Sequence, residues 1–213
     1  MRNVTFRRHR TREAETKPML QVATLTYYQG IITSQARQKL WPVPMTAAAE
    51  QVYTSGVTFG FGAKDDAACV NMYYFKDPNE VKCTLPADER EKRVKMIVEM
   101  LVFIHIASAA EAIMLADDCG IPLKQFFELV QRSAGASKVF SMFAEAMSGD
   151  EGAEPQTGRT MADGVRMLVK SIDAALAVGC ATPLANAALN LFSLFGRRLG
   201  EDLDASNLLR TWE

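Results

Sequence analysis

A lysine and a glutamate are spaced to share one face of a helix. Lys95 and Glu99 are four residues apart in a stretch that favours the start of a long helix. A lysine that loses water beside a carboxylate can be tuned for proton transfer. His105, further along the same stretch, adds a candidate general base. These residues predict acid–base chemistry; the alternatives are a solvated ion pair at Lys95 and Glu99, and a core histidine that only satisfies its hydrogen bonds.

Four other side chains are candidates for holding a substrate. Ser137 follows a run of small residues, and Arg166 has the planar guanidinium group that binds anions well. Tyr27 and Tyr28 belong to a tyrosine-rich segment and could line an apolar pocket. The alternatives are a surface arginine and tyrosines that pack in a core or between subunits.

Helical signals dominate the elements that must position these groups, and no recurring strand pattern is found. Prolines and glycines punctuate nine helical stretches, which gives an all-α bundle of eight or nine helices. The expected helices cover residues 20–40, 46–58, 65–75, 89–119, 123–133, 137–147, 161–177, 183–199 and 204–212. Residues 56–62 (GVTFGFG) look like a phosphate loop but follow a helical stretch, so we interpret them as a helix end.

The longest expected helix is apolar almost all round between Met96 and Ala116. Its length would also suit a membrane span. Ionisable residues inside it, including Glu99 and Glu111, are costly in lipid, so a central bundle helix or a helix buried between subunits fits better. Such a helix is expected to be covered on all sides.

Composition excludes several classes of function. Lysine and arginine number 24 against 25 acidic residues, so the net charge of −1 indicates neither a nucleic-acid nor a membrane-surface partner. Four dispersed cysteines suit a reduced, cytoplasmic setting better than a disulfide framework. With His9 and His105 as the two histidines, we expect no metal site.

The chain divides into four expected segments. Residues 1–17 form a basic arm with five arginines, for which a transit peptide is the alternative. Residues 18–75 form a partial helical repeat, residues 76–93 a charged linker and residues 94–213 a complete helical domain. The repeat is faint: Pro44, Asp65 and Tyr73 are followed, each after 139 residues, by Pro183, Asp204 and Trp212.

These stretches resemble a known family, the β-hydroxyacid dehydrogenases, which include 3-hydroxyisobutyrate and 6-phosphogluconate dehydrogenases. Residues 94–213 resemble its C-terminal all-α domain through KMIVEMLVFIHIASAAEAIMLADDCGIP, ELVQRSAGASKVFSMFAEAMSGD and KSIDAALAVGCATPLANAALNLF. Residues 18–75 resemble the last half of the same domain. The resemblance implies one and a half copies of that domain, a homodimer, and no dinucleotide-binding half, since no strand–GxGxxG–helix unit is found.

The family's active-site motifs are largely altered. Lys95 matches the catalytic lysine of the Lys-x-x-Asn-Asn motif, but Val98 and Glu99 replace its asparagines. Ser137 matches the serine of the family's Ala-Gly-Asn-Ser loop, but Ala136 replaces the asparagine of that loop. We align the later Lys-Asp motif with Arg166-Met167 in the full copy and with Tyr27-Tyr28 in the partial copy.

Three functions follow from this pattern. The first is a cofactor-independent enzyme in which Lys95, Glu99 and His105 catalyse isomerisation, cyclisation or elimination of a small, largely apolar molecule. Ser137, Arg166, Tyr27 and Tyr28 would bind that substrate. The second is a non-catalytic scaffold that pairs with a full-length dehydrogenase. The third is a residual NAD(P)-dependent oxidoreductase that obtains its nucleotide domain from another chain.

Overall fold

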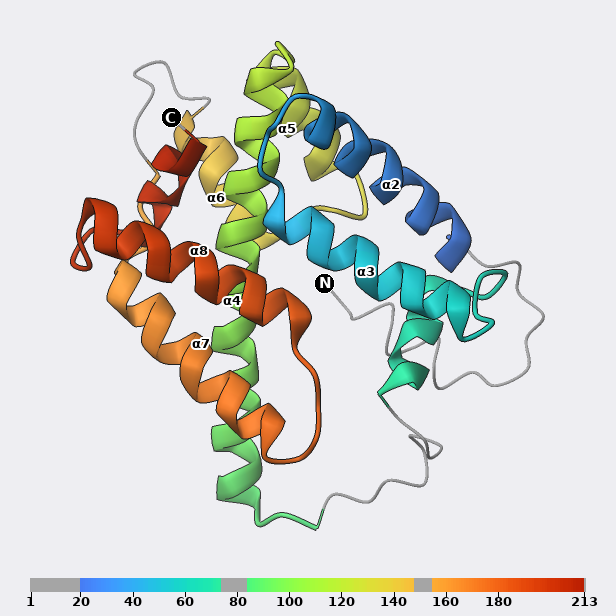
Figure 1. Ribbon diagram of the computed structural model, residues 1–213. Coiled ribbons are helices and arrows are strands. Elements are labelled where there is room, and N and C mark those ends of the chain that lie inside the picture. The colour runs from blue at the N-terminus through green and yellow to red at the C-terminus, as the bar shows by residue number, and fades with distance from the viewer. Residues whose placement is uncertain (1–19, 74–83, 148–154, 213) are drawn as a thin grey trace. The chain divides into compact units, whose positions relative to one another are not determined.

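The computed structural model describes residues 20–73, 84–147 and 155–212, which form two compact units, Met1–Pro86 and Ala87–Glu213. Throughout these described residues the regular elements are helices, and the extended pairing is limited to isolated bridges (Figure 1). The predicted all-α class is therefore confirmed. The predicted basic arm and residues 76–83 of the predicted linker lie outside the described residues.

Unit 1 is a helical hairpin closed by a short 3₁₀ helix. Its elements are α2 (Val22–Gln38), α3 (Pro44–Thr58) and η1 (Asp66–Met72). Pro44 begins α3, where its missing N–H costs nothing. The Asp65 side chain caps η1 by accepting a hydrogen bond from the Ala67 N–H at 3.2 Å. The helix expected over residues 65–75 is thus a 3₁₀ helix that ends at Met72.

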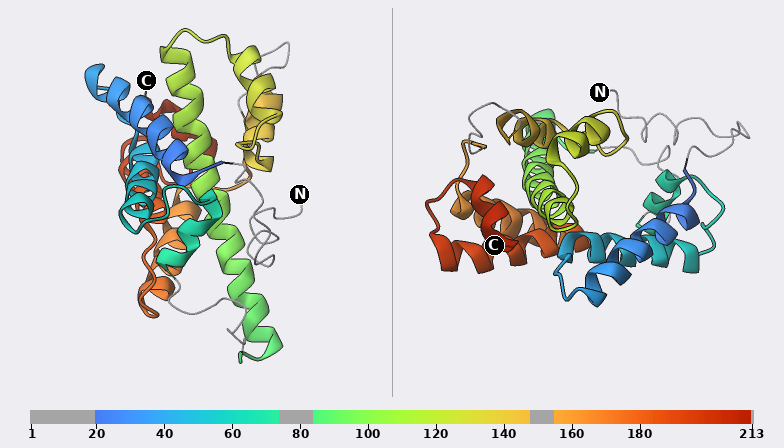
Figure 2. Two further views of the ribbon diagram at one scale, coloured as in Figure 1. Left: turned by 90° about the vertical axis from the view of Figure 1, so that its right-hand side faces the viewer. Right: turned by 90° about the horizontal axis from the view of Figure 1, so that it is seen from above.

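Unit 2 is built around one long helix. Its elements are α4 (Ala87–Asp118), α5 (Leu123–Gln131), α6 (Lys138–Met147), α7 (Met161–Leu176), α8 (Pro183–Leu199) and η2 (Ala205–Trp212). Each of the other five elements contacts α4, with α5 and α6 on one side and α7 and α8 on another (Figure 2). Because α4 begins at Ala87, the last seven residues of the predicted linker are helical.

The core of unit 2 forms where α4 meets α7 and α8. The rings of Phe103 and Phe192 meet edge to face, with centroids 5.5 Å apart. Gly164 of α7 lies against both rings, and a Cβ there would be 2.9 Å from Phe192 Cδ1 and 3.1 Å from Phe103 Cδ1. Glycine is therefore required for the close packing of α7.

One side of α4 is left exposed. Of the described helices, α4 is the one long and apolar enough to cross a membrane, yet residues such as Phe103 and Ile113 are buried in the core of unit 2. The opposite side carries an apolar stripe, which we call the α4 stripe; its members are Val94, Ile97, Val98 and Leu101, which are 42–54% exposed. The elements of unit 2 therefore do not cover α4 on all sides, and burial of this helix between subunits stays a prediction.

The last part of unit 2 repeats the backbone ties of unit 1. The Val22 N–H donates to the Lys64 carbonyl at 3.0 Å, and 139 residues later the Met161 N–H donates to the Leu203 carbonyl at 2.9 Å. The same offset relates two further ties, Asp66 N–H to Leu20 carbonyl and Ala205 N–H to Arg159 carbonyl. Helices α2, α3 and η1 therefore correspond to α7, α8 and η2.

Candidate functional site

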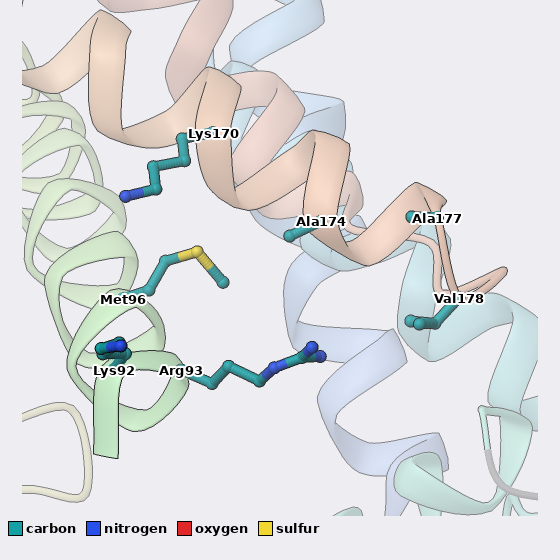
Figure 3. Close-up of a pocket in the computed structure, with 7 residues that line it drawn as sticks. All are labelled: Lys92, Arg93, Met96, Lys170, Ala174, Ala177 and Val178. Carbon is teal, nitrogen blue, oxygen red and sulfur yellow. The ribbon is translucent and has the colours of Figure 1, made fainter. Parts of the chain in front are cut away.

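A cationic cleft lies between α4 and α7 in unit 2 (Figure 3). Its volume is about 380 Å³, and it is open to solvent. Both helices contribute to its walls. The lining residues are Lys92, Arg93, Met96, Lys170, Ala174, Ala177 and Val178.

Two cations reach into the cleft from opposite helices. The Lys170 ammonium points from α7 towards α4, and the Arg93 side chain extends from α4 under α7. Among the described residues neither of them forms an ion pair with a carboxylate. The third cation, Lys92, contacts Asp88 at 3.6 Å and Glu89 at 3.2 Å, so its charge is already balanced. Arg93 and Lys170 are therefore the groups available to an incoming anion.

The floor between these cations is apolar. Met96 lies one helical turn after Lys92, and Ala174 lies one turn after Lys170 on α7. Ala177 and Val178 follow the end of α7 and complete the apolar lining. The small side chains of Ala174 and Ala177 leave the space that the cleft occupies. Two cations on either side of an apolar surface can bind an acid that carries a short carbon chain.

The predicted acid–base residues do not line this cleft. Lys95 and Glu99 lie on α4 within the same turns, but Lys95 is exposed and Glu99 is half-buried outside the lining. The side chain of His105 borders solvent, while its apolar neighbours remove enough water to lower its pKa. The structure places the three residues on one helix without bringing them into one pocket.

The side chain of Ser137 forms a hydrogen bond with the backbone of α6. Its Oγ accepts a hydrogen bond from the Phe140 N–H at 3.0 Å, which makes it the N-terminal cap of α6. This bond gives Ser137 a structural role, and its predicted role in substrate binding stays a prediction.

Arg166 lies outside the cationic cleft and pairs with Asp163, one turn earlier on α7. The Thr160 N–H that donates to Asp163 is the main cause of the lowered pKa of this carboxyl. Arg166 also lines a smaller hollow of about 250 Å³ beside Ser193 and Arg197 of α8. The carboxylate of Asp163 therefore already balances the charge of Arg166 in the absence of a ligand.

Tyr27 and Tyr28 belong to unit 1. Their side chains are 67% and 55% exposed, and their ring centroids are 5.7 Å apart. Neither lines the cationic cleft, whose walls belong wholly to unit 2. Their predicted role in substrate binding stays a prediction.

Arg93, Lys92 and Lys170 were not predicted as site residues. The sequence pattern that could have indicated them is a cation followed one helical turn later by an apolar or small residue. It occurs at Lys92–Met96 and at Lys170–Ala174. This pattern is common on helix surfaces, and the crossing of α4 and α7 is what makes the two stretches meet. Among the described residues no group of three histidines, cysteines or carboxylates could hold a metal ion.

Comparison with known proteins identifies the helical domain. The family model described as NAD-binding of NADP-dependent 3-hydroxyisobutyrate dehydrogenase matches residues 92–212. L-threonate dehydrogenase of Escherichia coli strain K12 is 35% identical over 105 residues, which cover 47% of this chain and 32% of that enzyme. L-threonate dehydrogenase of Pectobacterium atrosepticum is 29% identical over 163 residues, which cover 74% of this chain and 41% of that enzyme.

A solved structure agrees with this assignment. The 3-hydroxyisobutyrate dehydrogenase ygbJ of Salmonella typhimurium superposes with a TM-score of 0.50 at 31% identity, over 55% of this chain and 40% of that one. The chain thus spans about a third to two fifths of the length of the relatives it matches. Because the family model covers more than half of its residues, the chain belongs to the 3-hydroxyisobutyrate dehydrogenase family.

Proposed function

We propose that this chain binds a small organic acid in the cationic cleft and acts as the helical, substrate-side part of a hydroxyacid dehydrogenase. The observation that carries the proposal is a single cleft that is lined by Arg93 from α4 and by Lys170 from α7, with the apolar side chains of Met96 and Ala174 between them (Figure 3). Relatives of the chain are named for L-threonate and 3-hydroxyisobutyrate, which are both small hydroxy acids. A carboxylate would pair with the two cations, while its carbon chain would lie on Met96 and Ala174.

The family name also implies a nicotinamide dinucleotide. Doubly wound dehydrogenases hold its pyrophosphate where a strand turns through glycines into a helix. The described residues contain no such junction, and the cleft offers two unpaired cations rather than a row of backbone N–H donors. These residues do not form a complete dinucleotide site, so we derive no hydride-transfer step from them.

The predicted cofactor-independent isomerisation stays a prediction. It requires Lys95, Glu99 and His105 to act on one substrate, and the cationic cleft is lined by none of them. The dehydrogenase relationship does not itself favour that chemistry over simple binding.

Calorimetric titration with L-threonate and with 3-hydroxyisobutyrate tests the binding proposal. We expect Lys170→Ala and Arg93→Ala each to weaken binding about three- to tenfold, since each removes one charge-assisted contact. The matched control is Lys124→Ala, an exposed lysine on α5 outside the cleft, which should leave the affinity unchanged.

Two further measurements separate the competing functions. The uncharged amide of 3-hydroxyisobutyrate should not bind, and added salt should weaken binding of the acid. Equal losses in all three lysine and arginine variants would indicate unspecific attraction and would contradict the cleft assignment. A large loss in Lys95→Ala with none in Lys170→Ala would instead support the acid–base site.

A further inference from the structure

The two available cations of the cationic cleft come from different helices and are separated by an apolar side chain. Lys170 lies on α7 and Arg93 on α4, and Met96 lies between them (Figure 3). An acid with one carboxylate must draw both flexible side chains to one point, which costs side-chain entropy. An acid with two carboxylates can meet each cation where it lies. The separation of the cations therefore favours a ligand with two anionic groups.

The balance of charge in the cleft leads to the same class of ligand. Asp88 and Glu89 already balance Lys92, at 3.6 Å and 3.2 Å. Among the described residues no carboxylate pairs with Arg93 or Lys170. A dianion would provide one charge-assisted contact for each of these cations, whereas a monoanion would provide one carboxylate for both.

The lining offers no side-chain partner for the hydroxyl group of a substrate. Apart from its three cations, the cleft is lined by the apolar side chains of Met96, Ala174, Ala177 and Val178. None of these lining side chains is a strong acceptor for the O–H of an alcohol. A site that recognises a hydroxyl needs such a partner and then discriminates strongly against analogues that lack it. The cleft therefore selects its ligand by charge and carbon chain.

We propose that the cationic cleft binds a short, saturated dicarboxylate, with one carboxylate at Lys170 and the other at Arg93. Its methylene groups lie on Met96 and Ala174. The cleft volume of about 380 Å³ is at the small end of ligand pockets, which suits a spacer of a few methylene groups. This inference rests on the proposed function, the binding of a small organic acid in the same cleft, and it narrows the class of acid.

Calorimetric titration with glutarate and butyrate tests the second carboxylate, because butyrate is glutarate without one of its two carboxylates. We expect glutarate to bind at least about tenfold more tightly, since it makes a second charge-assisted contact. Lys170→Met and Arg93→Met each remove one charge but keep an unbranched side chain. In either variant the advantage of glutarate should fall to about twofold, the statistical benefit of two equivalent ends. The matched control Lys124→Met should keep the full advantage.

A second pair of acids tests the hydroxyl. Isobutyrate and 3-hydroxyisobutyrate differ in one hydroxyl group, and their affinities should agree within about twofold because no lining side chain accepts the O–H. Circular dichroism should show the same helix content in all variants.

The outcomes separate this inference from the proposed function. If butyrate and glutarate bind equally well, or if the hydroxyl strengthens binding more than about tenfold, the cleft still binds acids but the dicarboxylate assignment is wrong. An advantage of glutarate that survives in both methionine variants would indicate unspecific attraction and would also overturn it. If none of the four acids binds, the proposed function fails and the dicarboxylate assignment fails with it.

Discussion

At the scale of single residues, Asp204 organises the start of η2. Its carboxylate accepts hydrogen bonds from the N–H groups of Thr157 at 3.0 Å, Gly158 at 2.9 Å and Ser206 at 2.9 Å. Partial burial acts to raise the pKa of this carboxyl, but the N–H donors of Ser206 and Thr157 outweigh it and hold the pKa below its usual value. The charged form of Asp204 therefore stabilises the fold.

Removing this carboxylate should destabilise unit 2. We expect Asp204→Ala to lower the free energy of unfolding by about 2 kcal/mol at pH 7, because several N–H donors lose a charged acceptor. Urea denaturation measures the loss, and Asp202→Ala, a neighbouring exposed carboxylate, is the control.

The loss should depend on pH in one direction. Since the pKa of Asp204 is lowered on folding, its contribution is complete above the pKa of the unfolded chain, about 4, and disappears as the pH falls through the lower folded value. The difference between the wild type and Asp204→Ala should therefore shrink below about pH 4. A difference that stays constant down to pH 2 would mean that the charge of Asp204 is not responsible.

At the scale of elements, the corresponding helices α2 and α7 end in the same way but with different residues. After α2, the Leu40 N–H donates to the Arg37 carbonyl and the Trp41 N–H to the Ala36 carbonyl. After α7, the same bonds run from Gly179 to Leu176 and from Cys180 to Ala175. This hydrogen-bond pattern needs a left-handed residue, and φ is +56° at Leu40 and +70° at Gly179.

Leu40 is therefore a strained version of a position that favours glycine. Its side chain is 91% exposed, so little burial is lost when it is removed. We expect Leu40→Gly to raise the free energy of unfolding of unit 1 by about 0.5–1 kcal/mol, as relief of the left-handed strain exceeds the entropy cost of glycine. Thermal unfolding measures the gain.

The reciprocal change is the control for this prediction. Gly179→Leu should destabilise unit 2 by about 1 kcal/mol, because it introduces the same strain. If Leu40→Gly lowers the melting temperature, the left-handed position costs less than the added chain entropy, and the prediction is wrong.

The helices were predictable because their ends have local chemical causes. Pro44 and Pro183 begin helices, Gly120 follows the end of α4, and Asp65 caps η1, so each boundary can be located within a few residues. The 3₁₀ character of η1 and η2 could not be predicted, since it depends on how these segments are tied back to the preceding helices.

The site was less predictable because it depends on packing between helices that are distant in the sequence. Helical spacing correctly puts Lys95 and Glu99 in neighbouring turns of α4. It does not say which face of α4 meets α7, and that choice brings Lys170 opposite Arg93 and leaves Lys95 outside. A rotation of α4 by about one residue would exchange these roles.

At the scale of the whole molecule, the cationic cleft belongs to only one of the two compact units. The cleft is lined by α4, α7 and the two residues that follow α7, so its ligand contacts require unit 2 alone. Unit 1 contributes none of its lining. Binding of an acid should therefore not require unit 1.

A shortened chain tests whether the cleft binds an acid without unit 1. Residues 87–213 contain the complete lining of the cleft and the aromatic core at Phe103 and Phe192. We expect this fragment to fold into a helical unit and to bind L-threonate or 3-hydroxyisobutyrate within about twofold of the affinity of the full chain, because its charged contacts are unchanged. Calorimetry measures the affinity, and circular dichroism of the same preparation measures the helix content. If the fragment is folded by circular dichroism but no longer binds the acid, the site needs residues outside unit 2, and the assignment to the cleft between α4 and α7 fails.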